Sequence, residues 1–119
     1  MLLQYGAKVD ARTENDKTPL FLAATNGHHN IIRILIEHGA DINAVTKTGW
    51  TPLMAASAYG QHLIIDLLMC HGADIYATSH MGSTAIYLAS DYGNTLLKEI
   101  LTGWYQNRER QKNSEQVKC

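Results

Sequence analysis

The chain has 119 residues, a formal net charge of −1 and 45% hydrophobic residues. That length fits one domain, and the apolar content is enough for a core, which argues against global disorder. The near-neutral charge argues against a nucleic-acid or membrane-surface role, because both usually need a basic face.

The N-terminal residues show no feature of a targeting segment. Met1 to Lys8 have no long apolar core and no small-residue cleavage site, so they do not form a signal peptide. No run approaches the ~18 apolar residues of a membrane span. Cys70 and Cys119 are too few for a disulfide framework. This cysteine usage favours an intracellular location, in the cytoplasm or the nucleus.

A set of short motifs recurs every 33 residues along the chain. Thr18-Pro19-Leu20 returns as Thr51-Pro52-Leu53, and Thr84-Ala85-Ile86 follows after the same interval. Two further marker sets keep this step. They are Gly27, Gly60 and Gly93, and Gly6-Ala7, Gly39-Ala40 and Gly72-Ala73. One period shared by several markers indicates a repeat protein.

Each unit predicts two helices in succession. Thr18 caps a first helix over 19–26, Pro19 opens it with φ already set, and Gly27 ends it. Apolar residues at helical spacing predict a second helix over 30–38, which Gly39 stops. The same reasoning predicts helices over 52–59 and 62–71, and over 85–92 and 95–105. Turns are expected near 13–17, 46–50 and 79–83.

These motifs, with Ala23-Ala24, Gly27-His28 and Gly39 to Ala44, resemble the ankyrin repeat over roughly residues 1–103. The resemblance implies an all-α solenoid of stacked helix-turn-helix units with β-turn fingers. The expected division is the end of a truncated repeat at 1–12, ankyrin repeats at 13–45 and 46–78, a C-terminal capping repeat at 79–105 and a polar tail at 106–119.

Three positions depart from the family pattern. The histidine that usually follows Thr-Pro-Leu is Phe21, Met54 or Tyr87, so its side-chain hydrogen bonds are lost. The acidic residue that commonly opens a repeat is Thr13, Thr46 or Ser79, which keep an oxygen acceptor without charge. Asp16 stands where the other turns have Gly49 and Gly82.

The two ends of the array differ. Residues 1–12 match only the tail of a repeat, so we expect a fragment of a longer protein whose N-terminal end opens first. Lys98 replaces Ile32 and Ile65 of the earlier repeats, and a polar residue there is what a capping repeat needs on its solvent side. The tail is expected to be a frayed helix or disordered.

The sequence contains no catalytic signature. There is no glycine-rich phosphate loop, no HExxH and no CxxC pair. We therefore predict no enzyme activity, no cofactor and no small-molecule substrate. His38 and His71 share a repeat position and Cys70 adjoins His71, which would suit zinc, but histidine is common at these helix ends, so no metal site is predicted. Arg108, Arg110 and Lys112 alternate with Glu109 and indicate a solvated helix face, not a nucleic-acid site.

The resemblance implies a scaffold that binds a partner protein through its concave side, formed by the finger tips and the first helices. The alternative is a structural spacer or capping segment of a larger array. The residues expected to contact a partner are Lys47, Thr48, Trp50, Tyr59, His80, Met81, Asp91 and Tyr92. On this side the first repeat offers only polar groups, including Asn15, Lys17 and Thr25, whereas Tyr59 and Tyr92 share one position and are expected side by side.

Two residues on this chain have competing interpretations. Trp50→Ala is expected to weaken partner binding with little loss of stability, unless Trp50 packs along its own finger. Leu35 followed by Asp41-Ile42-Asn43 is similar to the pattern that the factor-inhibiting asparaginyl hydroxylase accepts in ankyrin repeats. Asn43 would be the acceptor. The alternative is a structural hydrogen bond from Asn43 within the turn.

Overall fold

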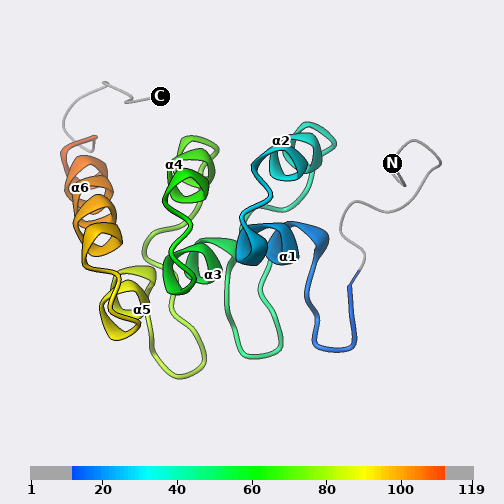
Figure 1. Ribbon diagram of the computed structural model, residues 1–119, viewed down its shortest axis with the longest axis horizontal. Coiled ribbons are helices and arrows are strands. Elements are labelled where there is room, and N and C mark those ends of the chain that lie inside the picture. The colour runs from blue at the N-terminus through cyan, green and yellow to red at the C-terminus, as the bar shows by residue number, and fades with distance from the viewer. Residues whose placement is uncertain (1–11, 112–119) are drawn as a thin grey trace.

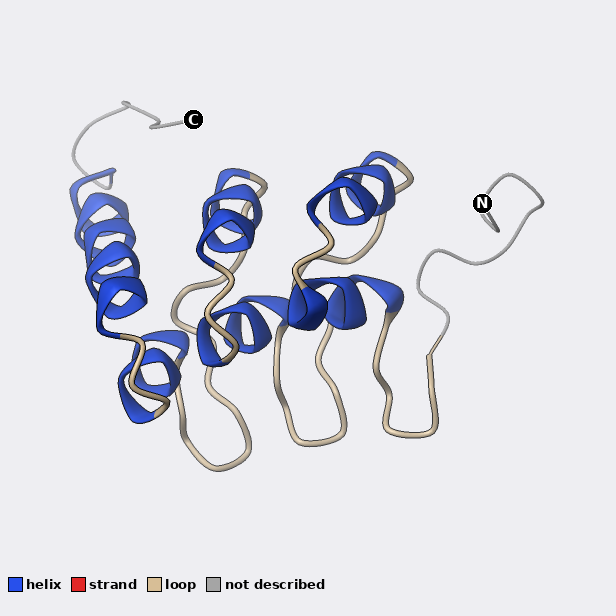
Figure 2. Cartoon of the chain, viewed as in Figure 1, coloured by secondary structure: helices blue, strands red, loops and turns tan. Residues whose placement is uncertain are grey.

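The computed structural model describes residues 12–111 and the side chains of residues 12–107. Within these residues it contains helices and turns and no β-strand, as Figure 2 shows. The helices are α1 (Pro19–Asn26), α2 (His29–Glu37), α3 (Pro52–Ala58), α4 (His62–Cys70), α5 (Ala85–Asp91) and α6 (Thr95–Gln111). The predicted all-α solenoid is confirmed. Residues 1–11 of the predicted truncated repeat and 112–119 of the tail lie outside the described residues.

The first helix of each pair begins at a threonine cap. The side-chain oxygens of Thr18, Thr51 and Thr84 accept hydrogen bonds from the backbone N–H groups of the residues three positions later, each at 3.2 Å. Such caps satisfy a helix donor that would otherwise lack a partner. Pro19 and Pro52 occupy the first turn, where no helical N–H is lost.

Glycine ends the first helix and lets the next repeat approach. Gly27 has φ 73°, a left-handed value that is favourable for glycine. A Cβ atom at this position would stand 2.6 Å from the Gln61 side-chain oxygen. The Gln61 amide in turn donates to the carbonyl of Thr25 at 3.1 Å. Asn94 repeats this arrangement one unit later, donating to the carbonyls of Ser57 and Ala58 at 3.1 Å.

The helices form two layers, which Figure 1 shows one above the other. The shorter helices α1, α3 and α5 line up next to the fingers, and α2, α4 and α6 form the outer row. Every residue of α3 is buried, because it lies between α1 and α5 in the middle of the array. Leu20, Leu53 and Leu88 of the inner row and Ile32, Ile65 and Leu101 of the outer row belong to one continuous core.

The three fingers have the same hydrogen-bond pattern. The backbone N–H of Thr13 donates to the carbonyl of Lys17, and Thr46 and Ser79 donate to the residues four positions later, at 2.8 to 3.0 Å. The same three residues also accept a bond through the side-chain hydroxyl, which replaces the acidic residue as an acceptor. The predicted turns at 13–17, 46–50 and 79–83 are confirmed.

Helix boundaries agree with the sequence predictions to within one residue except at the end of α6. We predicted that this helix ends at residue 105, but it continues to Gln111, six residues further (111 − 105 = 6). No Gly-Ala-Asp stop is present here, and glutamine, arginine and glutamate favour a helix. Gly103 lies inside the helix and does not end it.

The long α6 covers the C-terminal side of the array. The indole N–H of Trp104 donates to a carboxylate oxygen of Asp66 in α4 at 3.0 Å, and the Trp104 side chain is buried. The ring of Tyr105 meets that of Tyr76 edge-on at a centroid distance of 5.2 Å. Lys98 is exposed, whereas Ile32 and Ile65 at the same repeat position are fully buried. This is the polar outer side expected of a cap.

Candidate functional site

Hydrogen bonds between neighbouring fingers fix their spacing. The backbone N–H of Lys47 donates to the carbonyl of Asn15 at 3.1 Å, and that of His80 donates to the carbonyl of Thr48 at 3.0 Å. His80 also packs on Gly49, where a Cβ atom would stand 2.6 Å from the imidazole ring. The fingers therefore form a rigid row along one edge of the molecule, visible in Figure 1.

A hollow of about 420 Å³ lies between the first two fingers and the first inner helix. The first finger, α1, the second finger and the residue after α3 each contribute to it. Its lining residues are Asn15, Lys17, Phe21, Leu22, Thr25, Thr46, Lys47, Thr48, Trp50 and Tyr59.

Apolar side chains form the floor of this hollow and polar ones its rim. The Phe21 ring is buried, and Leu22 beside it is 38% exposed. Trp50 is half-buried and packs against the core, whereas Tyr59 is 57% exposed. The hydroxyls of Thr46 and Thr48 lie 3.1 Å apart in one hydrogen bond. The combination of an apolar floor and a few convergent polar groups is typical of binding sites.

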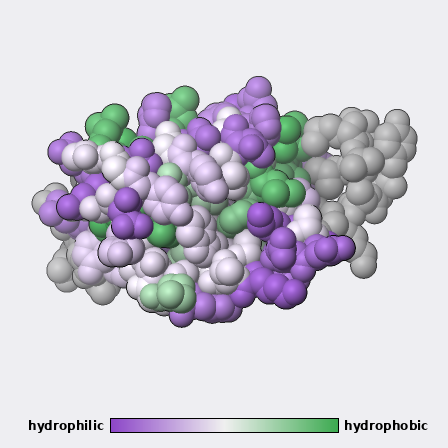
Figure 3. Space-filling view, turned by 60° about the horizontal axis from the view of Figure 1, so that its bottom comes forward, coloured by the Kyte–Doolittle hydropathy of each residue, from purple (hydrophilic) through white to green (hydrophobic). Residues whose placement is uncertain are grey.

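The whole finger face is more polar than this hollow. Figure 3 turns the fingers toward the viewer and shows mostly hydrophilic and near-neutral residues. The strongest hydrophilic colour gathers at the N-terminal end of the row, with hydrophobic atoms just beside it. An apolar patch framed by polar groups is the usual composition of a protein-binding surface.

One comparison with known proteins identifies the family. A family model described as ankyrin repeats (3 copies) matches residues 1–79, about two thirds of the chain. The chain belongs to the ankyrin repeat family. The comparison with curated proteins finds no match. Ankyrin repeats are in general protein–protein interaction modules and typically act as non-enzymatic scaffolds.

Four of the residues predicted to contact a partner of this ankyrin array come together in the hollow. Lys47, Thr48, Trp50 and Tyr59 all line it, and so do Asn15, Lys17 and Thr25. The other four, His80, Met81, Asp91 and Tyr92, belong to the third finger and the end of α5 and do not line it. Within residues 12–111, no ring contact joins Tyr59 to Tyr92, although each is more than half exposed.

The expectation that the first repeat offers only polar groups is wrong. Phe21 and Leu22 of α1 both belong to the apolar lining of the hollow. From the sequence alone, Phe21 had only the role of a replaced histidine, and Leu22 was assigned no role. Leu22 occupies the position of the buried Ala55 and Leu88, so only its place in the array leaves it accessible. The residue type of Leu22 alone did not indicate that its side chain would be accessible.

The structure supports packing of Trp50 against the core, and its role in binding stays a prediction. Its ring faces the hollow and packs against the core, and its backbone closes the second finger through Thr46. Trp50→Ala is therefore expected to lower stability as well as affinity. Tyr59, which is more exposed and lies just beyond α3, is the cleaner site for a binding test.

Asn43 connects two successive repeats through its side chain. Its side-chain oxygen accepts from the backbone N–H of Asp74 at 2.8 Å, and its amide approaches the carbonyl of Gly72 at 3.5 Å. The side chain of Asn43 thus has a structural role, but its hydrogen bonds reach the next repeat and do not lie within its own turn, where they were expected. The residue is exposed. Hydroxylation of Asn43 stays a prediction. Intact-mass analysis after co-expression with an asparaginyl hydroxylase tests it, and an unchanged mass would contradict it.

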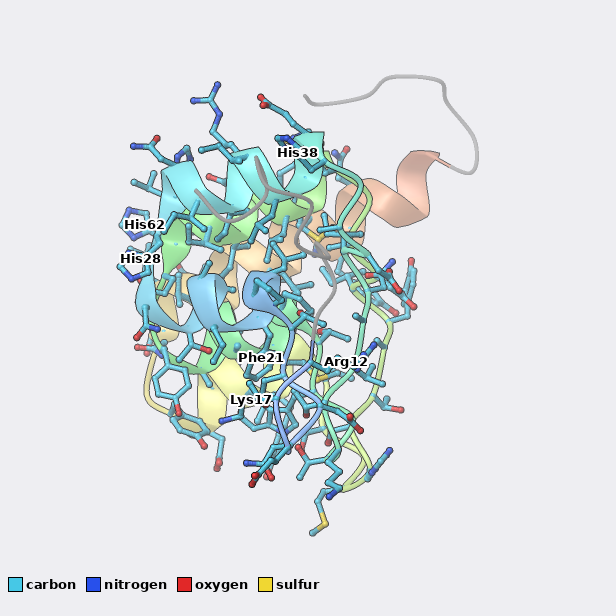
Figure 4. The ribbon with its side chains drawn as sticks, turned by 90° about the vertical axis from the view of Figure 1, so that its right-hand side faces the viewer. Arg12, Lys17, Phe21, His28, His38 and His62 are labelled. Carbon is cyan, nitrogen blue, oxygen red and sulfur yellow. The ribbon has the colours of Figure 1, made fainter. Side chains whose placement is uncertain are left out.

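The histidines do not gather into a metal site. Figure 4 shows His38 well separated from His28 and His62, and the His38 imidazole meets the carbonyl of Ile34 at 2.8 Å. Across the part of the chain that the structure describes, no group of three or more histidine, cysteine or acidic residues is placed to hold a metal ion. None of the described helices combines the length and apolarity that a membrane crossing requires.

Proposed function

We propose that this ankyrin array is a scaffold that binds a partner protein through its concave face, centred on the hollow between the first two fingers. The observation that carries the proposal is the convergence of Trp50, Tyr59 and Phe21 in one hollow. Tryptophan and tyrosine are enriched among binding hot spots because each buries a large rigid surface and still donates a hydrogen bond.

Rigidity of the face supports the same conclusion. The finger row is tied by backbone hydrogen bonds, and Gln61 and Asn94 tie successive inner helices together. A surface that is ordered before binding loses little conformational entropy when a partner docks. His80, Met81, Asp91 and Tyr92 would extend the contact along the row to the third finger.

A capture experiment with matched variants tests the proposal. The full chain captures binding proteins from a cell extract, and each captured protein is identified and its affinity measured. Tyr59→Ala should weaken the principal partner by about 2 kcal/mol, as expected for a hot spot. Leu63→Ala is the control, because Leu63 is 61% exposed, similar to Tyr59, but lies on the outer helix α4. Equal affinity of the Tyr59 and Leu63 variants would contradict the proposal.

The alternative function is that of a spacer or capping segment within a larger array. The polar outer side of α6, where Lys98 replaces a core isoleucine, favours it. A spacer would capture no partner of its own. Stable folding of the chain without any specific binding protein would therefore support this alternative over the scaffold.

A further inference from the structure

The charged residues that line the hollow are of one sign. Lys17 and Lys47 are the only charged residues among the ten that line it. Glu14 and Asp16 belong to the first finger but are exposed outside the lining. Neither lysine forms an ion pair with another residue of the described range 12–111. The two ammonium groups are therefore available to a ligand.

Part of the apolar floor lies close to the Lys17 ammonium group. The Lys17 Nζ atom stands 5.9 Å from the centre of the Phe21 ring, and Figure 4 shows the two side chains on the same side of the array. Leu22 and Trp50 continue the floor, and Tyr59 borders it. If an apolar group of a ligand entered the floor, the ligand groups next to it would lie within reach of a lysine ammonium group.

The backbone of the fingers is not free to recognise an added strand at this junction. The N–H of Lys47 and the carbonyl of Asn15 already bond to each other, as do the N–H of His80 and the carbonyl of Thr48. Recognition by added main-chain pairing needs an unpaired edge. Side chains must therefore carry the selectivity of the hollow.

We propose that the hollow accepts an acidic segment of a partner protein, in which an apolar side chain enters the floor and flanking carboxylates meet Lys17 and Lys47. This inference rests on the proposed function and adds the chemistry of the ligand. Complementary charge gives such a surface its selectivity and speeds the encounter, whereas the apolar floor supplies buried area.

The next interval along the array lacks this combination. One repeat later, the positions of Lys17 and Lys47 hold Trp50 and His80, and those of Phe21 and Leu22 hold Met54 and Ala55. Only the tyrosine is kept, as Tyr92. The acidic preference is therefore a property of the first interval, and Leu63→Ala on the outer helix α4 again serves as the control for Tyr59→Ala.

Selection from a library of short random peptides displayed on phage tests the inference, with the full chain as bait. The selected peptides should combine aspartate or glutamate with a leucine or an aromatic residue. Lys47→Glu should weaken them about tenfold, whereas Lys98→Glu, the same charge change on exposed Lys98 of α6, should have little effect. Binding should also weaken as salt shortens the Debye length from about 30 Å to about 8 Å.

The outcomes separate this inference from the proposed function. Peptides that lose affinity with Tyr59→Ala more than with Leu63→Ala but show no acidic preference would overturn the acidic ligand and leave the face intact. Equal loss with Lys47→Glu and Lys98→Glu would also overturn it. Peptides insensitive to both Tyr59→Ala and Lys47→Glu would overturn the acidic ligand and the proposed face together. Failure to select any peptide would count against a segment as the ligand.

Discussion

Side chains at equivalent positions of the first and last repeats differ in their exposure to solvent. Ile31 of α2 is 41% exposed, whereas Ile64 and Leu97 at the same position of α4 and α6 are buried. Lys98 of α6 is exposed where Ile32 and Ile65 are fully buried. Position in the array, and not residue type alone, decides what each side chain contacts.

This difference separates stability from recognition. In a solenoid each repeat is stabilised by its neighbours, so the middle helices and the covered end carry most of the packing energy. The hollow proposed for binding lies at the other end, where Leu22 remains accessible. Variants of buried residues at the C-terminal end should therefore act on folding, and variants of exposed residues that line the hollow mainly on binding.

The largest effect is expected for Trp104→Ala at the C-terminal end. This change removes a buried indole and its hydrogen bond to Asp66, and such truncations cost about 3–5 kcal/mol. Denaturant unfolding measures the loss. Glu99→Ala, an exposed change on the same helix, is the control and should stay within about 0.5 kcal/mol of the parent. A loss below about 1 kcal/mol at Trp104 would mean that α6 does not stabilise the array.

A matched pair of isoleucines sharpens the comparison. Ile64→Ala removes a side chain that is 2% exposed and should lower the unfolding free energy by about 2–5 kcal/mol. Ile31→Ala at the same repeat position removes a partly exposed side chain and should cost less than half as much. Both variants are compared by denaturant unfolding. Equal losses would show that the first repeat is as well covered as the second.

The smallest effect is expected in the first finger. Asp16 has φ 60°, whereas the equivalent Gly49 and Gly82 adopt φ 82° and 81°. Left-handed backbone costs a non-glycine residue roughly 1–2 kcal/mol, and somewhat less for aspartate. Asp16→Gly should therefore raise stability by about 0.5–1 kcal/mol, measured as an increase in Tm. The control is Glu14→Gly, an exposed residue on the same finger as Asp16. If Asp16→Gly raised Tm no more than Glu14→Gly, the backbone of Asp16 would not be strained.

The helices of this chain could be predicted because the residues that begin and end them lie next to them in the sequence. Threonine caps and left-handed glycines are set by a few neighbouring residues, so five of the six helices agree to within one residue at both ends. The end of α6 was misplaced because the repeat length set it at residue 105, whereas no Gly-Ala-Asp stop is present there and the helix continues to Gln111.

The candidate site could be predicted only in part. The register placed Trp50 and Tyr59 on the concave face, and both line the hollow. Phe21 and Leu22 were missed because their place in the hollow depends on which repeat stands beside them, which residue spacing does not encode. The same holds for the packing of Trp50 against the core.

Residue-by-residue hydrogen exchange, on the free chain and with a selected acidic peptide bound, tests the separation of stability from recognition most directly. In the free chain, amides of α1 and α2 should exchange faster than those of α3 and α4, because low-stability regions open first. Binding should raise protection in the fingers at 13–17 and 46–50. Even protection across the three helix pairs, or a rise centred on α6 when the peptide binds, would contradict the account.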